Sequence, residues 1–346
     1  MPKKFKYFII GFIIVIPSFT FWIYSWFTSP NILIFDGDAP IEYQVKEGTD
    51  FPTLLDDLVD RKIVKHGLSL AFVAKVMGYQ ENIKPGWVLL EPKMNNMETV
   101  RALRLPYLKE VTLTFNNVRF IEDIPVKLCA NIDASAAVFE QLLSDSLLLK
   151  EHGFTKETIL CMFIPNTYKV FKETTAEELF LRMKKEYVDF WEGERRRKAD
   201  SLGLSPEEVI TLASIVNEET KVRVERPKVA SVYLNRLQNP QLFPKLEADP
   251  TLRFAAKAYD RPPLNKDKKI DSPYNTYKYA GLPPGPICMP DVSSIDAVLS
   301  PGNHSYFFFV AKGDCSGTHN FSETNRQHNK FVKLYRKRVK LPCEDD

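Results

Sequence analysis

A long uncharged stretch near the N-terminus constrains this chain more than any other feature. Residues 7–27 read YFIIGFIIVIPSFTFWIYSWF and contain no Asp, Glu, Lys, Arg or His. A helix of about 20 apolar residues spans the hydrocarbon core of a bilayer, so the stretch predicts one transmembrane helix. Lys3, Lys4 and Lys6 precede it and predict that residues 1–6 form a cytoplasmic tail.

The rest of the chain is therefore expected outside the cytoplasm. Trp22, Tyr24 and Trp26 suit the far membrane interface as an aromatic belt. A cleaved signal peptide is the alternative interpretation. The apolar stretch is long for a signal peptide, however, and no A-x-A-like cleavage site follows it. We therefore expect an uncleaved membrane anchor.

The composition is that of a globular protein. Among 346 residues, 44% are hydrophobic and 26% are charged, enough to bury cores in two or three units. The 47 basic residues nearly balance the 44 acidic ones. Nothing in this balance indicates a nucleic-acid surface, so we expect no nucleic-acid partner.

The cysteines do not indicate a metal site. They show neither C-x-x-C spacing nor a zinc-like grouping with the histidines, so we expect no structural metal. Their odd number leaves at least one thiol free if all pairing is intramolecular, and the sequence does not choose the pairs. Mostly buried, apolar thiols are the favoured interpretation. The five are Cys129, Cys161, Cys288, Cys315 and Cys343.

After the anchor, two prolines and a glycine in residues 28–40 predict a stalk. Residues 41–105 then follow a strand, helix, helix, strand order, with a break at Gly48 and a turn at Pro85-Gly86. This order predicts a small β-α-α-β unit. It is poor in polar clusters, so a binding module is favoured over a catalytic one.

The larger part, residues 106–339, is expected to be an α+β domain, followed by a tail at 340–346. A strand begins at Glu110, and residues 121–150 are mainly helical in pattern. One amphipathic helix is predicted from Thr174 to about Leu202, opened by a Thr174-x-x-Glu177 capping box. SYFFFVA (305–311) predicts an apolar strand.

A helix with a well-marked start carries the chemically suggestive residues. Ser205 as N-cap, Pro206 in the first turn and Glu208 three residues after the cap fix its register. At about 100° per residue, Glu218 falls on the polar face, whereas Glu219 falls at the edge of the apolar stripe. Glu219 is therefore expected to lie at least partly against the core.

That position has a chemical consequence. Apolar surroundings and the negative end of the helix dipole both disfavour a charged carboxylate, so the pKa of Glu219 should be raised. An acid that stays protonated near neutral pH can protonate the leaving oxygen of a glycosidic bond. The alternative is a carboxylate paired with Arg223, Arg226 or Arg236, and spacing alone slightly favours that alternative.

Four long stretches resemble the endolytic murein transglycosylase family (MltG, YceG-like) in order and rough spacing, and the similarity runs from the stalk to about Val339. The family's helix reads A-S-I-[IV]-E-x-E-T with the catalytic glutamate directly before the threonine, which is Glu219 here. Asn217 replaces the family's earlier glutamate. The stretches are TLASIVNEETKVRVERPKVASVYLNRL, EADPTL, YNTYKYAGLPPGPICMP and SYFFFVAKGDCSGTHNFSETNRQHN.

The resemblance implies a single-pass enzyme of the cell inner membrane, with its catalytic domain in the periplasm. Such an enzyme cuts nascent peptidoglycan at the MurNAc-GlcNAc bond and leaves 1,6-anhydroMurNAc ends, without a cofactor. Glu219 would act as acid and then as base. Glycan strands are the implied partner, and peptidoglycan synthases are candidate partners. Residues 41–105 resemble the family's LysM-type subdomain.

Other residues of the matched stretches are candidates for substrate binding. Glu225, Glu247 and Asp249 are candidate second acids, although a turn at Asp249-Pro250 is the favoured alternative. Asn235 and Arg236 are alternatively expected to orient Glu219. Loop packing or a structural hydrogen bond is the alternative for the aromatic, amide and histidine residues. The substrate-binding set is Asn166, Tyr168, Glu225, Asn235, Asp249, Tyr274, Asn275, Tyr277, His319 and Phe321.

Two of these residues belong to PNTY (165–168), which resembles the family's P-D-T-Y/W element. Asn166 stands where the family usually has aspartate, so a charge-dependent role there is not expected. Two other functions remain open at this stage. One is a muramidase that hydrolyses the same bond with a second carboxylate, and the other is a non-catalytic peptidoglycan-binding scaffold of the cell-wall synthesis machinery.

Overall fold

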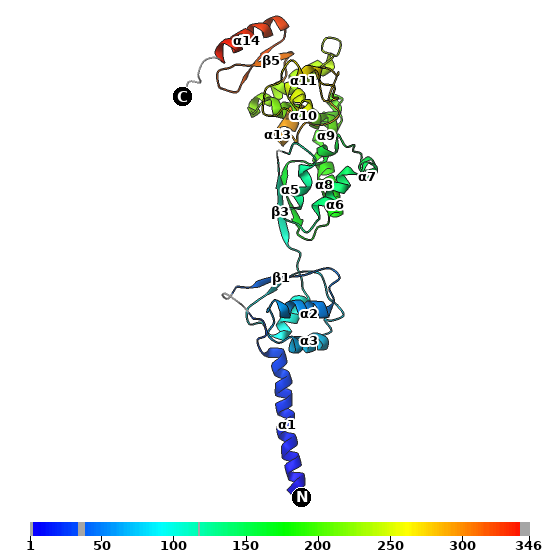
Figure 1. Cartoon of the computed structure of the whole chain (residues 1–346), viewed down its shortest axis with the longest axis vertical. Helices are drawn as coiled ribbons and strands as arrows, with labels where there is room; N and C mark the ends of the chain where they lie inside the picture. The colour runs from blue at the N-terminus through cyan, green and yellow to red at the C-terminus, as the bar shows by residue number, and fades with distance from the viewer. Residues whose placement is uncertain (1–2, 34–38, 117, 340–346) are drawn as a thin grey trace. The chain divides into compact units, whose positions relative to one another are not determined.

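The computed structural model describes residues 3–33, 39–116 and 118–339, with side chains from residue 15 onward. The fold is α+β, as predicted, with helices predominating over short strands (Figure 1). Within the described ranges, the strands form three two-stranded sheets, β1-β2, β3-β4 and β5-β6.

The chain divides into two compact units, each with its own hydrophobic core. Unit 1 is Met1–Glu110 with Phe171–Glu173, and unit 2 is Val111–Val170 with Thr174–Asp346. Because the two cores are separate, each unit is described by itself.

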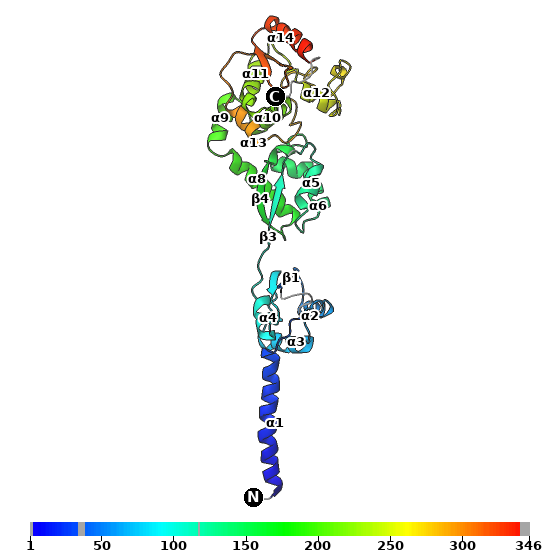
Figure 2. The same ribbon diagram turned by 90° about the vertical axis from the view of Figure 1, so that its left-hand side faces the viewer.

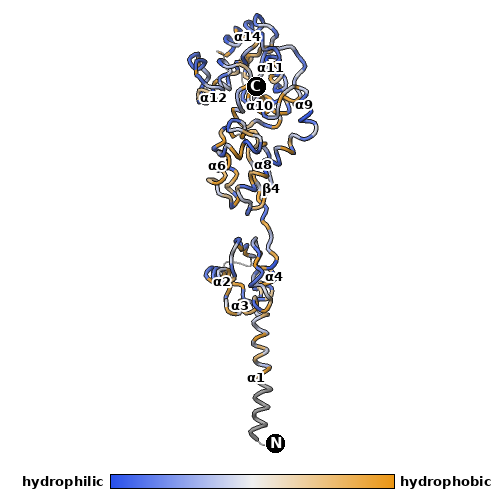
Figure 3. The backbone as a smooth tube through the Cα atoms, turned by 90° about the vertical axis from the view of Figure 1, so that its right-hand side faces the viewer, coloured by the Kyte–Doolittle hydropathy of each residue, from blue (hydrophilic) through white to orange (hydrophobic). Residues whose placement is uncertain are grey.

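Unit 1 contains the predicted β-α-α-β order. Strands β1 and β2 pair antiparallel, with Ile41 opposite Leu90, and hydrophobic residues run along α3 (Figure 3). One further helix, α4, was not predicted because it is short, and an Asn95–Glu98 capping box begins it. The elements are α1 (Lys3–Thr28), β1 (Ile41–Val45), α2 (Phe51–Asp60), α3 (Gly67–Val76), β2 (Gly86–Leu90) and α4 (Asn96–Leu103).

The N-terminal helix α1 contains 26 residues, and the exposed side chains on its described part include Val15, Phe21 and Tyr24. No helix is long and apolar enough to cross a membrane when only the described residues are considered. The predicted span 7–27 lies partly outside them, since its side chains are described only from residue 15. The predicted tail 340–346 lies wholly outside the described residues, and the tail 1–6 has no described side chains.

The start of the predicted stalk is packed into unit 1. Pro30 forms a bridge with Asn95, and Ile32 forms one with Val64. Asn31 between them is 3% exposed, and its side chain accepts a hydrogen bond from the His66 backbone N–H at 2.7 Å. The stalk at 28–40 stays a prediction, and its described start packs against unit 1, where the polar side chain of Asn31 is satisfied. Residues 34–38 lie outside the description.

Unit 2 is mainly helical. Strands β5 and β6 pair antiparallel, with Phe308 opposite Ser322. The elements are β3 (Glu110–Phe115), α5 (Asp123–Cys129), α6 (Ala136–Ser144), α7 (Ser146–Glu151), η1 (Ile159–Met162), β4 (Asn166–Phe171), α8 (Ala176–Trp191), α9 (Glu194–Leu202), α10 (Pro206–Glu219), η2 (Arg223–Glu225), α11 (Arg226–Gln238), α12 (Asp249–Ala255), η3 (Asp267–Lys269), α13 (Val292–Leu299), β5 (Phe308–Ala311), β6 (His319–Ser322) and α14 (Asn325–Arg338).

Two predicted helix boundaries in unit 2 are corrected. The long helix predicted from Thr174 is two helices, α8 and α9, separated at Gly193, whose φ of +71° does not continue a right-handed helix. Its cap is Thr175, one residue later than predicted. Helix α14 is capped by Thr324, and Ser322, which ends strand β6, is buried.

Helix α10 occupies the centre of unit 2. It packs against α9, α11, α12, α13 and η1 (Figures 1 and 2). Every residue from Val209 to Asn217 is buried, including the polar residues Thr211 and Ser214. The side predicted to be polar is therefore enclosed as well. The Ser214 hydroxyl accepts a hydrogen bond from the Ile287 backbone N–H at 3.0 Å, which satisfies it in the core.

Candidate active site

Glu219 is the last residue of α10, which begins as predicted. The Ser205 hydroxyl accepts a hydrogen bond from the Glu208 backbone N–H, and the Glu208 carboxylate accepts one from the Ser205 N–H. This capping box fixes the start of the helix. Because α10 is buried along most of its length, its end carries Glu219 to a fixed place at the edge of the core.

The surroundings of Glu219 favour its neutral form. The side chain is half-buried, and its Oε1 accepts a hydrogen bond from the hydroxyl of Tyr233, a residue of α11 that is 1% exposed. Burial raises the pKa of Glu219 to about 7, and the negative charge of Asp249 acts in the same direction. The Tyr233 hydrogen bond and the charges of Arg253 and Arg236 oppose this rise in pKa.

The sequence also allowed an ion pair between Glu219 and Arg223, Arg226 or Arg236, but these arginines lie elsewhere or have other partners. Arg226 is ion-paired with Asp291 at 3.0 Å. Arg236 donates hydrogen bonds to the backbone carbonyls of Phe307 and Leu246. Arg223 is exposed in a different groove. In the described part of the chain, none of the three arginines forms an ion pair with Glu219.

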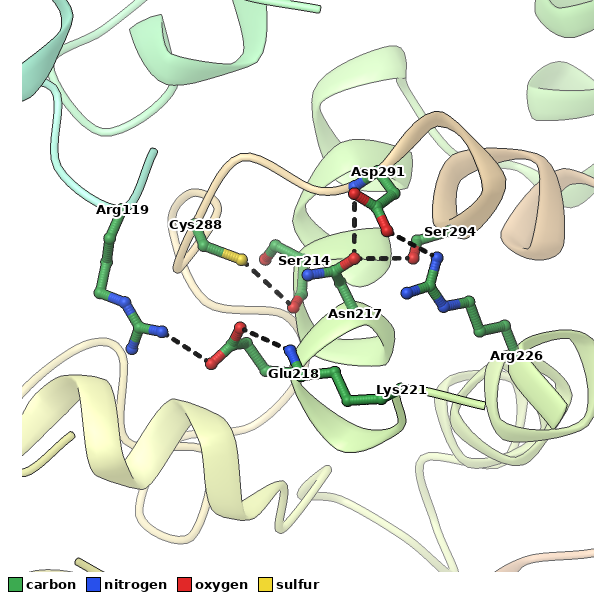
Figure 4. Close-up of polar contacts among 9 residues, drawn as sticks. All are labelled: Arg119, Ser214, Asn217, Glu218, Lys221, Arg226, Cys288, Asp291 and Ser294. Carbon is green, nitrogen blue, oxygen red and sulfur yellow. Dashed lines mark hydrogen bonds and ion pairs between the residues drawn. The ribbon is translucent and has the colours of Figure 1, made fainter. Parts of the chain in front are cut away.

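Glu218, the neighbouring acid, has cationic partners (Figure 4). Its carboxylate lies 2.8 Å from the Arg119 guanidinium and 3.8 Å from the Lys221 ammonium. The Glu218 side chain is 14% exposed. The two adjacent glutamates therefore differ in kind, because Glu218 is ion-paired and Glu219 is bonded to a neutral hydroxyl.

Asn217, which stands where the resembled family has its earlier glutamate, has a structural role (Figure 4). Its Oδ1 accepts hydrogen bonds from the Asp291 backbone N–H at 3.3 Å and the Ser294 hydroxyl at 3.1 Å. These bonds attach the start of α13 to α10. Asn217 is 4% exposed and faces away from Tyr233 by its place on the helix.

Asp249 is the second carboxylate near Glu219. It is the first residue of α12, so the turn favoured from the Asp-Pro sequence is wrong, and Pro250 is accommodated in the first helical turn. Asp249 is exposed and accepts a hydrogen bond from the Tyr277 hydroxyl at 2.6 Å. Burial and this bond raise the pKa of Tyr277, and the charge of Glu219 contributes. Glu219, Asp249 and Tyr277 therefore share one electrostatic environment.

Thr276 attaches the loop that carries Tyr277 to the start of α12. Its backbone carbonyl accepts a hydrogen bond from the Glu247 N–H at 3.1 Å, and its hydroxyl accepts one from the Ala248 N–H at 3.0 Å. The same hydroxyl lies 2.7 Å from the Thr251 hydroxyl. These contacts fix the distance between the two segments.

Two other loop candidates have packing roles. Asn275 is fully buried, and its amide donates hydrogen bonds to the carbonyls of Lys268 and Ile270. The Tyr274 ring packs on the Phe254 ring, with centroids 4.7 Å apart. Both residues shape the loop from inside, and the contacts described here do not turn them toward Glu219.

Asn235 and Tyr168 likewise serve the surrounding structure. The Asn235 amide donates to the carbonyls of His304 and Tyr306, so it holds a loop and does not contact Glu219. Tyr168 is 4% exposed, and its hydroxyl donates to the Ile164 carbonyl at 2.6 Å.

Asn166 is exposed and lines a separate polar groove of about 390 Å³. No residue of α10 lines this groove, so the structure does not bring Asn166 together with Glu219. The lining residues are Thr114, Phe115, Asn116, Pro165, Asn166, Thr167, Arg223, Asp291, Val292 and Ser293.

Glu225 and His319 are bonded to each other. The Glu225 carboxylate lies 2.9 Å from His319 Nδ1 and accepts the His319 backbone N–H at 3.1 Å. Both side chains are nearly buried. Phe321, two residues further on, stacks on Tyr306 with centroids 5.8 Å apart. This group connects β6 to η2, directly after the end of α10.

Sequence reasoning missed Tyr233 and Arg253. Tyr233 lies inside a matched stretch, close to Asn235 and Arg236, whose polar groups are more conspicuous. A usable signal was present, since Tyr233 is a hydroxyl-bearing residue on the apolar side of α11. A buried tyrosine hydroxyl needs a partner.

Among the described residues, most cysteines are buried, as expected. Cys129, Cys161 and Cys288 are free thiols, and Cys315 is disulfide-bonded. Burial raises the pKa of the Cys288 thiol to about 12, so it is not a nucleophile at neutral pH. Within the described ranges, no group of three or more His, Cys, Asp or Glu side chains is placed to hold a metal ion.

Comparisons with known proteins agree on one family. The endolytic murein transglycosylase of Bacillus subtilis (strain 168) is 37% identical over 166 residues, which are 47% of this chain and 44% of that protein. The endolytic murein transglycosylase of Streptococcus pneumoniae serotype 2 (strain D39 / NCTC 7466) is 26% identical over 304 residues, which are 77% of this chain and 53% of that protein. The matches thus span about half the length of these curated relatives.

A solved structure is similar as well. The crystal structure of a yceG-like protein from Listeria monocytogenes has a TM-score of 0.53 and 26% identity, and the match covers 85% of this chain and 99% of that one. The sequence pattern of the YceG-like family matches residues 43–334, which extend over parts of both units and include every candidate site residue. This match covers more than half of the chain and includes α10 with its terminal Glu219. The chain therefore belongs to the YceG-like family.

Proposed function

We propose that this protein is an endolytic murein transglycosylase, which cuts the MurNAc-GlcNAc bond within nascent peptidoglycan strands and leaves 1,6-anhydroMurNAc ends. Membership of the family and the names of the relatives support this activity. One observation carries the proposal. Glu219 is half-buried, has a pKa raised to about 7, and is bonded to a neutral tyrosine hydroxyl instead of a cation.

In the first step, protonated Glu219 gives its proton to the oxygen between the two sugars as the bond to MurNAc C1 breaks. Burial keeps the carboxyl protonated near neutral pH, and the carbonyl end of α10 disfavours its charge further. Because Tyr233 occupies Oε1, the other oxygen, Oε2, is the one available to the sugar. The proton therefore leaves from a defined atom.

In the second step, the Glu219 carboxylate takes the proton of the C6 hydroxyl on the same MurNAc, and the C6 oxygen closes onto C1. The carboxyl regains its proton, and no water is consumed. One carboxyl serves both steps because the nucleophile belongs to the substrate. The Tyr233 hydrogen bond stabilises the carboxylate between the steps.

Asp249 and Tyr277 are the substrate-facing candidates that the contacts support best. Asp249 lies close enough to raise the pKa of Glu219, so its negative charge can stabilise the positive charge that develops on the sugar ring. The Tyr277 ring, held by Asp249, offers an aromatic face for a sugar. A hydrolytic muramidase that uses Asp249 to activate water is the second candidate, and it would give reducing ends.

We further propose that α1 anchors the protein in the inner membrane and that unit 2 acts on the periplasmic side, with peptidoglycan synthases as partners. The uncharged sequence of residues 7–27 supports the anchor. The disulfide at Cys315 supports an oxidising compartment. The β1-α2-α3-β2 order of unit 1 supports its assignment as a LysM-like module.

Adjacent glutamates provide a matched test. The purified full chain, Glu219→Gln and Glu218→Gln would each be incubated with sacculi, and the products analysed by mass spectrometry. We expect anhydro ends from the native chain and from Glu218→Gln, and a loss of at least about 100-fold from Glu219→Gln, the usual minimum for a catalytic acid. Reducing ends would instead indicate a muramidase, and no new ends from the native chain would indicate a scaffold.

A further inference from the structure

Helix α3 of unit 1 carries an apolar stripe on its surface. Leu68, Phe72 and Val76 are spaced four residues apart, so they lie on one face of the helix. Their exposed fractions are 85%, 37% and 60%. The α3 residues Leu70, Val73 and Ala74 already belong to the core. The stripe is therefore additional to the face that α3 needs for folding, and a contiguous exposed patch of this kind indicates an interaction surface.

The stripe continues onto the end of α1. The ring of Phe72 lies 5.3 Å from that of Trp26 and 6.3 Å from that of Phe27. The Asn96 amide donates a hydrogen bond to the Trp26 carbonyl at 2.7 Å, which ties α4 to the same end of α1. Figures 1 and 2 show α3 beside this end. Ring contacts thus connect the exposed stripe of α3 to the end of α1.

A groove of about 410 Å³ lies at this junction. One part of its lining is apolar, with Leu68 and Trp26, and the other is polar, with hydroxyl, amide and imidazole groups. Two exposed lysines lie near the stripe in sequence, Lys65 before Leu68 and Lys75 directly before Val76. The lining residues are Ser25, Trp26, Ser29, Pro30, Asn31, His66, Leu68, Ser69 and Asn96.

We propose that α3 lies in the interface of the phospholipid bilayer, with the Leu68, Phe72 and Val76 side chains among the acyl chains near the headgroups, and that a phospholipid fills the groove. This inference rests on the proposed anchoring by α1. A bilayer is the occupant that covers α1 and α3 as one continuous surface. The mixed lining of the groove matches a molecule with a polar head and an apolar tail, and the lysines match anionic headgroups.

The consequence is that unit 1 is held on the membrane surface by two helices. A single spanning helix would leave the unit free to tilt and rotate above the lipid. Contact along α3 would restrict this motion and fix which face of unit 1 is turned away from the membrane. Strands β1 and β2, which lie on the side of unit 1 away from α1 in Figures 1 and 2, would then face the cell wall.

The test uses the full chain in nanodiscs of phosphatidylethanolamine and phosphatidylglycerol. Cysteine would replace Leu68, Val76 or Leu89 one at a time and carry the fluorophore NBD, and lipids with spin-labelled acyl chains would quench it. Leu89 is the matched control, since it is a leucine of β2 with 42% exposure in the same unit. The unsubstituted chain gives the background, because its free cysteines among the described residues are buried.

We expect strong quenching at positions 68 and 76 and little at 89, with no difference among the three positions in detergent. Equal, weak quenching at all three positions in a chain that stays with the discs would overturn the inference and leave the anchor in place. Separation of the chain from the discs would overturn both the anchor and the inference. Anhydro ends from sacculi, measured on the same labelled variants, report the enzymatic proposal independently.

Discussion

Glu219 is a carboxyl whose protonation the fold controls, and this gives a prediction for stability against pH. Its pKa is 4.5 in the unfolded chain and about 7 in the folded one. Below 4.5 both states are protonated. Between about 4.5 and 7 the unfolded state ionises first, so stability falls as the pH rises. Above pH 7 both states are ionised, and the free energy of unfolding is then about 3 kcal/mol lower than it is below pH 4.5.

The substitution Glu219→Gln removes this titration and keeps an oxygen that can accept the Tyr233 hydrogen bond. We therefore expect the variant to gain stability over the native chain as the pH rises from 5 to 8, as measured by urea unfolding. Glu218→Gln loses ion pairs to Arg119 and Lys221 and should show no such gain. If Glu219→Gln raised the free energy of unfolding equally at pH 5 and pH 8, the raised pKa of Glu219 would be contradicted.

The hydroxyl of Tyr233 gives a second prediction. Its hydrogen bond lowers the pKa of Glu219 relative to burial alone. Tyr233→Phe should therefore raise that pKa, and the pH at which activity declines on the alkaline side should rise. The rate itself should fall, because the carboxyl is less well oriented. A pH–rate profile measures both effects, and an unchanged or downward-shifted alkaline limb would contradict this role.

At this scale the sequence predicted the position of Glu219 at the edge of the core, and it named Asp249 and Arg236 but not Tyr233 among its neighbours. The helical register placed Glu219 at the edge of the apolar stripe because the capping signals at Ser205 and Glu208 fix the phase of α10. Tyr233 belongs to another helix, and only the packing of α11 against α10 brings the two side chains together. The sequence pattern of each helix does not give the distance between side chains on two different helices.

Among the elements, α10 depends on α13 for its position. Asn217 is the shared contact, since its side chain accepts hydrogen bonds from the Asp291 N–H and the Ser294 hydroxyl. Asn217→Ala would leave both donors without this acceptor and should cost about 1–3 kcal/mol of unfolding free energy. Asn166→Ala, at an exposed asparagine, should change stability by less than about 0.5 kcal/mol.

Denaturant unfolding of the two variants makes the comparison. The activity of folded Asn217→Ala should remain near that of the native chain, because Asn217 does not contact Glu219. Loss of activity without loss of stability would show instead that Asn217 takes part in the reaction.

Elements with a strong local signal were predicted well, and those decided by packing were not. The β-α-α-β order of unit 1 follows from periodicity and turn residues. The break at Gly193 was missed because the charge pattern continues across it, whereas the backbone leaves the helical conformation at Glu192, which is extended, and at Gly193, which has a positive φ. Strand β6 was not predicted, since HNFS (319–322) acquires its extended form by pairing with β5.

The whole molecule has two separate cores, so we expect two unfolding transitions. Leu54 is fully buried in unit 1, and Leu54→Ala should destabilise that unit by about 2–5 kcal/mol. Leu179 is equally buried in unit 2, so Leu179→Ala should destabilise unit 2 and lower the temperature of its transition. Differential scanning calorimetry distinguishes these outcomes, and a shift of both transitions by either variant would indicate one cooperative unit.

The attachment of two loops through Thr276 bears on how relatives of this protein diverge. The hydroxyl and the carbonyl of Thr276, together with a bridge between Lys245 and Gly281, join segments that are distant in sequence. The exposed neighbours Lys278 and Tyr279 take no part in these contacts. Mutations at these neighbours can accumulate without loosening the wall beside the acid. Under the proposed function, preference for differently modified glycans can therefore change there while the proposed chemistry at Glu219 is kept.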